Sequence, residues 1–187
     1  VDLGNNFATT EADIVEMSTR LASTGSLVGL TQAQIMALST AMSSVGIKAE
    51  SGGSTMAKLL KKMQLAVETN SEALQDYASV ADMTGEEFSK SFKDDAVVAL
   101  SAFIDGLNDT ERNGASSVKI LDDMGLSEVR LSNTILALAG ADGVMSSAIE
   151  TANKAWGENT ALAIEAGKRY ETAESKVQLM KNAFSEL

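Results

Sequence analysis

A helical period is clearest in the stretch Met56-Ala57-Lys58-Leu59-Leu60-Lys61-Lys62-Met63-Gln64-Leu65-Ala66-Val67. Its apolar residues Met56, Leu60, Met63 and Val67 follow one another every three or four positions, while the lysines fall on other sides of the helix. This spacing is typical of an amphipathic helix, because residues three and four apart lie on one side of the helix cylinder. The stretch therefore predicts a helix whose apolar side faces a core.

The same period appears in segments along the rest of the chain, and no segment shows the alternating pattern of a strand. The 187 residues include no proline, the strongest helix breaker. We therefore predict an all-α fold, in which a multi-helix bundle of short helices leads into a long C-terminal amphipathic helix. The apolar sets are Ile14, Met17 and Leu21; Ile35, Leu38, Met42 and Val45; Leu74, Tyr77 and Ala81; Phe88, Phe92, Val97, Leu100, Ile104 and Leu107 in one helix; Val118, Leu121 and Met124; and Val129, Ile135 and Leu138.

Polar residues and glycines mark where the predicted helices start and end. Thr10 stands before two acidic residues, which favours a helix start. The stretches Thr31-Gln32-Ala33-Gln34 and Thr84-Gly85-Glu86-Glu87 are capping boxes, in which side chain and backbone satisfy each other's polar groups at the first turn. Glycine after an apolar run favours a left-handed residue that closes the last turn. The glycines predicted to end helices are Gly25, Gly46 and Gly125.

Residues 145–187 carry the longest apolar seam, with steps of four and three throughout. Such a heptad seam favours packing against a partner helix, and its one polar position, Asn159, can fix the register. The predicted organisation is a compact helical module at 1–140 and a long helix at 141–187 that continues beyond this sequence. Whether the seam packs within its own domain, on another copy or on another protein stays open. The candidate interface residues are Met145, Ile149, Trp156, Asn159, Tyr170, Val177, Met180 and Phe184.

Composition narrows the classes of function. Cysteine and histidine are both absent, which removes the usual ligands of structural zinc and the Ser-His-Asp and Cys-His nucleophiles. The 15 basic and 26 acidic residues give a net charge of −11, and such an acidic surface repels nucleic-acid phosphates. The longest apolar run, residues 135–141, is far shorter than the ~20 residues of a membrane span. We expect no enzyme, no cofactor, no metal, no sequence-specific nucleic acid and no membrane span.

Three kinds of stretch have features of a ligand site but favour a structural interpretation. Glu50-Ser51-Gly52-Gly53-Ser54-Thr55 lacks the phosphate-loop order and reads as a flexible turn before a helix. Asp105-Gly106-Leu107-Asn108-Asp109 lacks calcium-loop spacing and is interpreted as a helix end. Neighbouring acids on a helix point in different directions, so acidic pairs are interpreted as solvated faces rather than catalytic carboxylates. These pairs are Glu86-Glu87, Asp94-Asp95 and Asp122-Asp123.

A series of short motifs runs along essentially the whole chain in a distinctive order. In the first half these are Asn5-Asn6-Phe7-Ala8-Thr9-Thr10-Glu11-Ala12-Asp13-Ile14-Val15, Arg20-Leu21, Val28-Gly29-Leu30-Thr31, Ile35 with Ala37-Leu38, Gly46-Ile47-Lys48-Ala49-Glu50-Ser51-Gly52-Gly53 and Met83-Thr84-Gly85-Glu86-Glu87-Phe88. In the second half they are Ala99-Leu100, Phe103-Ile104, Gly106-Leu107, Leu121, Met124-Gly125-Leu126, Val129-Arg130, Ala155-Trp156, Glu158-Asn159, Ala161-Leu162, Glu165-Ala166 and Arg169-Tyr170. Together they closely resemble the core region of the tail tape-measure proteins of tailed phages and prophages. One departure is Ala22-Ser23-Thr24-Gly25, where a further glycine is expected.

The resemblance implies a structural protein of the virion. Family members are long and largely helical, fill the tail tube, set tail length during assembly and leave the tail when DNA is ejected. The implied partners are tail-tube subunits, tail-assembly chaperones and tail-tip proteins. The implied locations are the lumen of the phage tail and, during assembly, the bacterial host cytoplasm. The family supplies no catalytic residue for this region, and the chain is expected to be a piece of a much longer protein.

A different class of function is also compatible with the residues. A helical adaptor or secreted effector module would bind a protein partner through its C-terminal helix, using the seam at 145–187. The genes that surround the coding sequence distinguish the two hypotheses, because tail-tube and tail-tip genes favour the phage protein.

Overall fold

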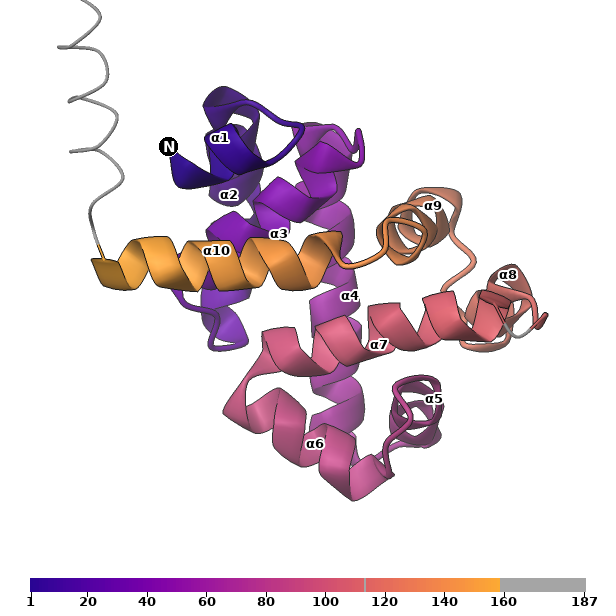
Figure 1. Ribbon diagram of the computed structural model, residues 1–187. Helices are drawn as coiled ribbons and strands as arrows, with labels where there is room; N and C mark the ends of the chain where they lie inside the picture. Colours follow the sequence, from indigo (N-terminus) through magenta and orange to yellow (C-terminus); the bar gives the residue numbers. More distant parts are fainter. Residues whose placement is uncertain (113, 159–187) are drawn as a thin grey trace, which may run out of the picture.

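The computed structural model describes residues 1–112 and 114–158, and these form ten helices and no strand. The predicted all-α class is therefore confirmed for this part of the chain. The predicted C-terminal helix begins as α10, but its continuation past residue 158 lies outside the described residues. The helices, labelled in Figure 1, are α1 (Asp2–Asn6), α2 (Glu11–Leu27), α3 (Gln32–Ser44), α4 (Ala49–Thr69), α5 (Glu72–Val80), α6 (Gly85–Asp94), α7 (Ala96–Arg112), α8 (Ser117–Asp123), α9 (Val129–Ala139) and α10 (Val144–Glu158).

The predicted helix starts are confirmed in detail. The Thr10 hydroxyl accepts the backbone N–H of Asp13 at the start of α2. Both capping boxes form, with Gln34 at 2.9 Å from the Thr31 nitrogen and Glu87 at 2.8 Å from the Thr84 nitrogen. Each box satisfies donors that the first helical turn leaves without intrahelical partners.

The predicted helix ends are confirmed at two glycines and wrong at a third. Gly46 and Gly125 follow α3 and α8 with φ of 80° and 65°. Gly25 lies inside α2, which continues to Leu27, and the left-handed residue there is Gly29. A Cβ on Gly25 would stand 2.9 Å from Ile35 Cγ1, so this glycine allows α2 and α3 to approach closely.

The helix predicted from Phe88 to Leu107 is two helices, α6 and α7, separated at Asp95. The extended backbone of Asp95 (φ −156°, ψ 99°) interrupts the helix. Its carboxylate accepts the backbone N–H of Val97 at 3.0 Å, and so it caps α7. It also accepts the side-chain amide of the buried Gln34, at 2.9 and 3.0 Å. Asp95 is therefore a cap and a link between α3 and α7 rather than part of a solvated face.

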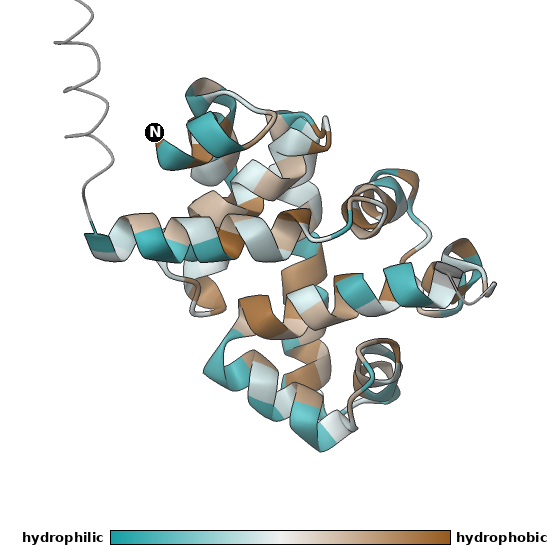
Figure 2. Cartoon of the chain, in the orientation of Figure 1, coloured by the Kyte–Doolittle hydropathy of each residue, from teal (hydrophilic) through white to brown (hydrophobic). Residues whose placement is uncertain are grey.

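The central helix is α4, which contacts α2, α3, α5, α6 and α9. In Figure 1 it runs through the middle of the molecule, and in Figure 2 most of its ribbon is hydrophobic or neutral in colour. Its first turns contain Gly52 and Gly53, so the flexible turn predicted at 50–55 is wrong. A Cβ on Gly53 would lie 2.6 Å from Arg20 Cβ. These glycines bring the backbones of α2 and α4 together.

A cluster of aromatic side chains fills the core between α5, α6 and α7. The Tyr77 ring centroid lies 5.4 Å from that of Phe103 in an edge arrangement and 6.1 Å from that of Phe88 in a stacked one. Burial, with the nearby charge of Asp76, raises the pKa of Tyr77 to about 12. Other parts of the core are rich in methionine, with Met17, Met42, Met56 and Met63 fully buried.

The helix α10 lies across α3 and also contacts α1 (Figure 1). Met145, Ala148 and Ala152 are its buried residues, spaced three and four apart. The predicted boundary near residue 140 stays a prediction, because only the first part of the predicted 141–187 unit is described. Among the described residues, no single helix combines the length and hydropathy of a membrane span, although α9 and α10 do so as a pair bent by 77°.

Candidate interaction surface

The most conspicuous exposed side chain is Trp156, the single tryptophan of the chain. It lies in the last turn of α10 and is 57% exposed. A contiguous exposed apolar patch, rather than one exposed side chain, is what distinguishes an interaction surface. Two cavities meet at Trp156, and both also include Met36 of α3. We call these cavities together the Trp156 surface.

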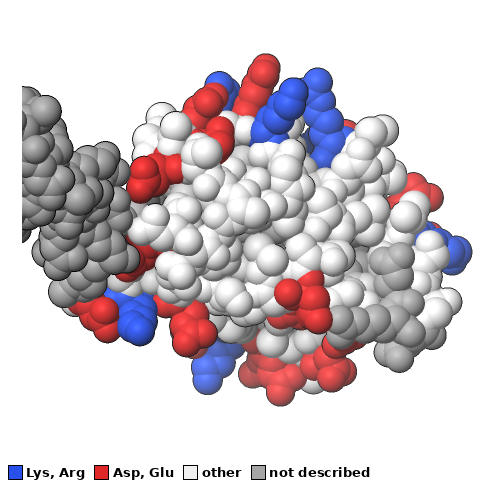
Figure 3. Space-filling view, turned by 45° about the horizontal axis from the view of Figure 1, so that its top comes forward, with Lys and Arg blue, Asp and Glu red and all other residues white. Residues whose placement is uncertain are grey.

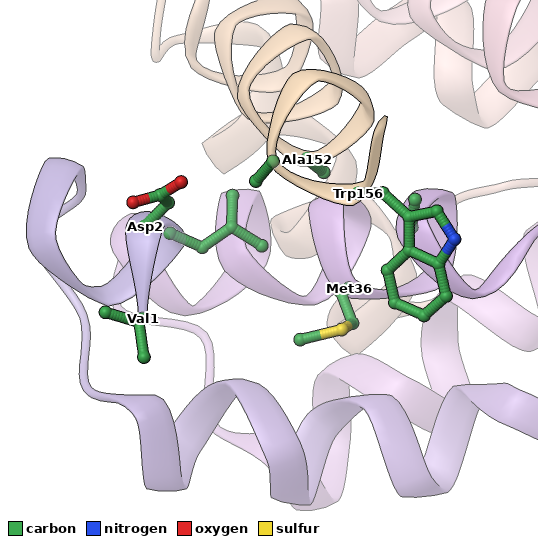
Figure 4. Close-up of a pocket in the computed structure, with 8 residues that line it drawn as sticks. Val1, Asp2, Met36, Ala152 and Trp156 are labelled. Atoms are coloured by element: carbon green, nitrogen blue, oxygen red, sulfur yellow. The ribbon is translucent and has the colours of Figure 1, made fainter. Parts of the chain in front are cut away.

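The first cavity, of about 380 Å³, lies between α1, α3 and α10. Figure 4 shows Ala152 and Trp156 reaching it from α10, with Met36 below the ring. Leu3 and Ala33 complete the apolar floor. The Asp2 carboxylate stands at the edge, and the indole nitrogen lies on the side of the ring away from Met36.

The second cavity, of about 290 Å³, is a groove between α2 and α3 that ends at Trp156. The α2 residues of this α2–α3 groove are spaced three and four apart, so they lie on one side of the helix. Val15, at the start of this row, is 58% exposed. The next positions carry small side chains. The lining residues are Val15, Ser18, Thr19 and Ala22 of α2, Gln32, Ile35 and Met36 of α3, and Trp156.

Among the described residues, the side chain of Ser18 differs from other buried polar side chains in forming no hydrogen bond. Its Oγ is hidden from solvent and has no hydrogen-bond partner among the described residues. Other hydroxyls on helices, such as that of Thr19, bond to the carbonyl four residues earlier. Because an unpaired buried hydroxyl is costly, Ser18 lowers the stability of the fold locally.

The Trp156 surface is nearly free of charge. Among the side chains that line its two cavities, that of Asp2 alone is charged. Figure 3 shows a broad uncharged stretch on one face of the molecule, with acidic and basic side chains gathered around its rim. Protein-binding surfaces are usually depleted of charge at their centre and polar at their rim.

Three of the predicted interface residues lie in α10, and the other five follow it in the sequence. Met145 is 3% exposed in the core, and Ile149 is half-buried against the same core. Trp156 is exposed and central to the surface. Their role as an interface stays a prediction. The remaining members, Asn159, Tyr170, Val177, Met180 and Phe184, lie outside the described residues.

Sequence reasoning missed the α2 side of the surface. Val15 is the residue that indicates this side in the sequence. It is apolar, but it does not lie on the buried side of the helix, which Ile14, Met17 and Leu21 form. The contribution of Met36 is visible only after α10 is placed on α3.

The acidic residues near the middle of the chain do not assemble into a metal site. The stretch 105–109 lies inside α7, so the predicted helix end there is wrong. Partial burial, followed by the charges of Asp109 and Asp142, raises the pKa of Asp105. Within residues 1–112 and 114–158, no group of three or more acidic side chains is arranged to hold a metal ion.

The Trp156 surface is thus a mainly apolar pair of cavities where α10 meets α1, α2 and α3. Comparison with known proteins found no protein-family model, no curated protein and no solved structure that matches this chain.

Proposed function

We propose that this chain is a helical structural module of a phage tail tape-measure protein. The observation that carries the proposal is the ordered series of motifs from Asn5 to Tyr170 that resembles the core region of that family. The all-α fold of the described residues is compatible with it. The motifs are individually short, and their order along the chain is what gives them specificity.

In this role the module acts through contacts with other proteins. A helical chain converts residue number into length at about 1.5 Å per residue, so a long helical protein inside the tube can set tail length. The described residues form a compact unit within that ruler. Its partners are tail-tube subunits, tail-assembly chaperones and tail-tip proteins. It resides in the tail lumen after assembly in the host cytoplasm, and it leaves during DNA ejection.

The second candidate is a helical adaptor or secreted effector module. The exposed Trp156 beside two cavities is compatible with this alternative, because such a module would bind its partner through an exposed surface on the C-terminal helix. In that case the partner is a host or bacterial protein bound through the C-terminal helix.

Gene context and deletion distinguish these functions. The complete reading frame is expected to encode a long helical protein beside tail-tube and tail-tip genes. An in-frame deletion of the codons for residues 1–158 is expected to abolish tails or change their length in electron micrographs. Supplying the complete gene from a plasmid should restore the normal length. Particles with an unchanged tail length and titre after the deletion would contradict the tape-measure proposal.

A further inference from the structure

The helix α10 is held against the rest of the molecule by few large side chains. Its 15 residues include three that are buried, Met145, Ala148 and Ala152, so Met145 is the one large apolar side chain among them. The neighbouring α9 has 11 residues and buries three leucine or isoleucine side chains. We propose that α10 opens away from α3 as a unit, about a hinge at residues 140–143, and thereby controls access to the first cavity of the Trp156 surface. This opening belongs to the chain itself and holds for either of the functions above.

Polar side chains do not fasten α10 to the body. Within residues 1–112 and 114–158, no side chain of α10 forms a hydrogen bond or an ion pair with another helix. The hydroxyl of Ser146 bonds locally, to the carbonyl of Gly143 at 3.1 Å. The start of α9, by contrast, is tied to α4 by the ion pair between Glu128 and Lys58. The contact of α10 with the body therefore rests on apolar packing alone.

That packing is incomplete towards the end of the helix. Ala148 is fully buried against the body. From one turn later, Ala152 and Ala155 of α10 face Ala33 and Met36 of α3 across the first cavity, of about 380 Å³ (Figure 4). Side chains that line a void lack contacts on one side and lose the dispersion attraction that those contacts supply. The second half of α10 is therefore held less firmly than the first.

The connection between α9 and α10 has the features of a hinge. Residues 140–143 separate the two helices, whose axes differ in direction by 77°. Gly140 ends α9, and Gly143 has a φ of 71°, in the left-handed region that glycine adopts without strain. Between them, Asp142 Oδ1 lies 3.5 Å from Nδ2 of Asn108 in α7. Rotation about Gly143 can therefore move α10 while α9 keeps its place in the core.

Opening exposes much less apolar surface than unfolding of the whole chain does. It brings Met145 and a few alanines of α10 into water, together with Ala33 and Met36 of α3, and it leaves the contacts of α4 intact. Units with few buried apolar contacts open far more often than the complete fold unfolds. The first cavity is therefore expected to become an open apolar face of α3 in a minor population of folded molecules.

Hydrogen exchange of the full chain at increasing urea concentrations measures this opening. The amides of α10 should have protection factors at least about tenfold lower than those of α4. They should also share one dependence on urea, smaller than that of α4 but above zero, because opening as a unit exposes an intermediate amount of surface. Protection and urea dependence equal to those of α4 would show that α10 leaves the body only on complete unfolding. No urea dependence would show fraying residue by residue. Either result would overturn the proposal.

Two substitutions separate opening of α10 from unfolding of the body. Ala78→Gly weakens α5, which lies far from α10 in Figure 1, and should lower the protection of α4 by about two- to tenfold. The protection of α10 should not change, because α5 is intact in both the closed and the open molecule. Met145→Ala, at a contact that opening breaks, should lower the protection of α10 by at least about tenfold. A parallel decrease in α10 and α4 with Ala78→Gly would contradict an independent opening, as would unchanged α10 protection with Met145→Ala.

A covalent link across the cavity tests the hinge directly, because the chain has no cysteine of its own. Met36→Cys and Ala155→Cys, which line the first cavity from α3 and α10, are joined within one chain by a short bifunctional maleimide. The link should raise the protection of α10 to that of α4. Each single-cysteine variant, treated with the same reagent, should keep the α10 protection of the unmodified chain. Linked molecules whose α10 amides exchange as fast as before would overturn opening about residues 140–143.

Discussion

Asp95 shows how one side chain can organise two helices. It caps α7 through the Val97 nitrogen and also receives the amide of Gln34, which belongs to the capping box of α3. Two helix starts, far apart in the sequence, are therefore joined through one polar network. Its neighbour Asp94 ends α6 on the exposed side.

Removal of this network should destabilise the fold. We expect Asp95→Ala to lower the free energy of unfolding by about 1–3 kcal/mol, because a cap is lost and the Gln34 amide loses its partner. Asp94→Ala removes the same charge one position earlier and should cost less than about 0.5 kcal/mol. Urea denaturation of both variants measures the difference, and equal stabilities would contradict the role assigned to Asp95.

Two glycines in helices should respond to alanine in opposite directions. Gly53→Ala pushes a Cβ against Arg20 and should separate α2 from α4, at a cost of about 1–3 kcal/mol. Gly157→Ala meets open space and should stabilise α10 by about 0.5–1 kcal/mol. Thermal unfolding followed by circular dichroism distinguishes them. If Gly53→Ala left the thermal stability unchanged, α2 and α4 would not be held at this separation.

Tyr77 should make stability fall at high pH. Its pKa is 10.0 when unperturbed and about 12 in the folded chain, so the unfolded chain loses its proton first. Folding stability is therefore complete below pH 10 and decreases as pH rises towards 12, by about 2–3 kcal/mol. Tyr77→Phe removes this contribution. The decrease between pH 9 and 12 should thus be steeper in the unmodified chain than in the variant, as measured by urea denaturation at each pH.

At the scale of helices, the sequence predicts where most elements begin because capping is local. A capping box involves residues three apart, and both boxes form as expected. Glycines are less predictable, because Gly25 and Gly53 serve contacts with helices that arrive from elsewhere in the chain. The break at Asp95 was missed for a similar reason. The apolar period continues across it, and its extended backbone is held partly by Gln34.

The contact of α10 with α3 depends on small side chains. Ala148 is fully buried there, so Ala148→Leu should overpack the contact and cost about 1–3 kcal/mol. Asn153 lies on the exposed side of α10, and Asn153→Leu should leave stability within about 0.5 kcal/mol. Hydrogen exchange should show faster exchange in α10 of the first variant alone. Unchanged protection of α10 in Ala148→Leu would contradict the close packing described here.

At the scale of the whole molecule, the fold places the mainly apolar Trp156 surface at the last turn of α10. Trp156 could be predicted as an anchor from the seam, but its surroundings could not. Those surroundings come from α1, α2 and α3, which meet α10 only in the folded chain. The net charge of −11 makes the chain repulsive to other acidic chains.

The most direct measurement of the proposed role is quantitative mass spectrometry of purified phage particles, before and after DNA ejection is triggered. If this chain is part of a tape-measure protein, peptides from residues 1–158 will be present in intact particles at a fixed ratio to tail-tube subunits. They will be depleted from the emptied tails, while the tube subunits remain. Intact particles with tails of normal length that contain none of these peptides would contradict the assignment.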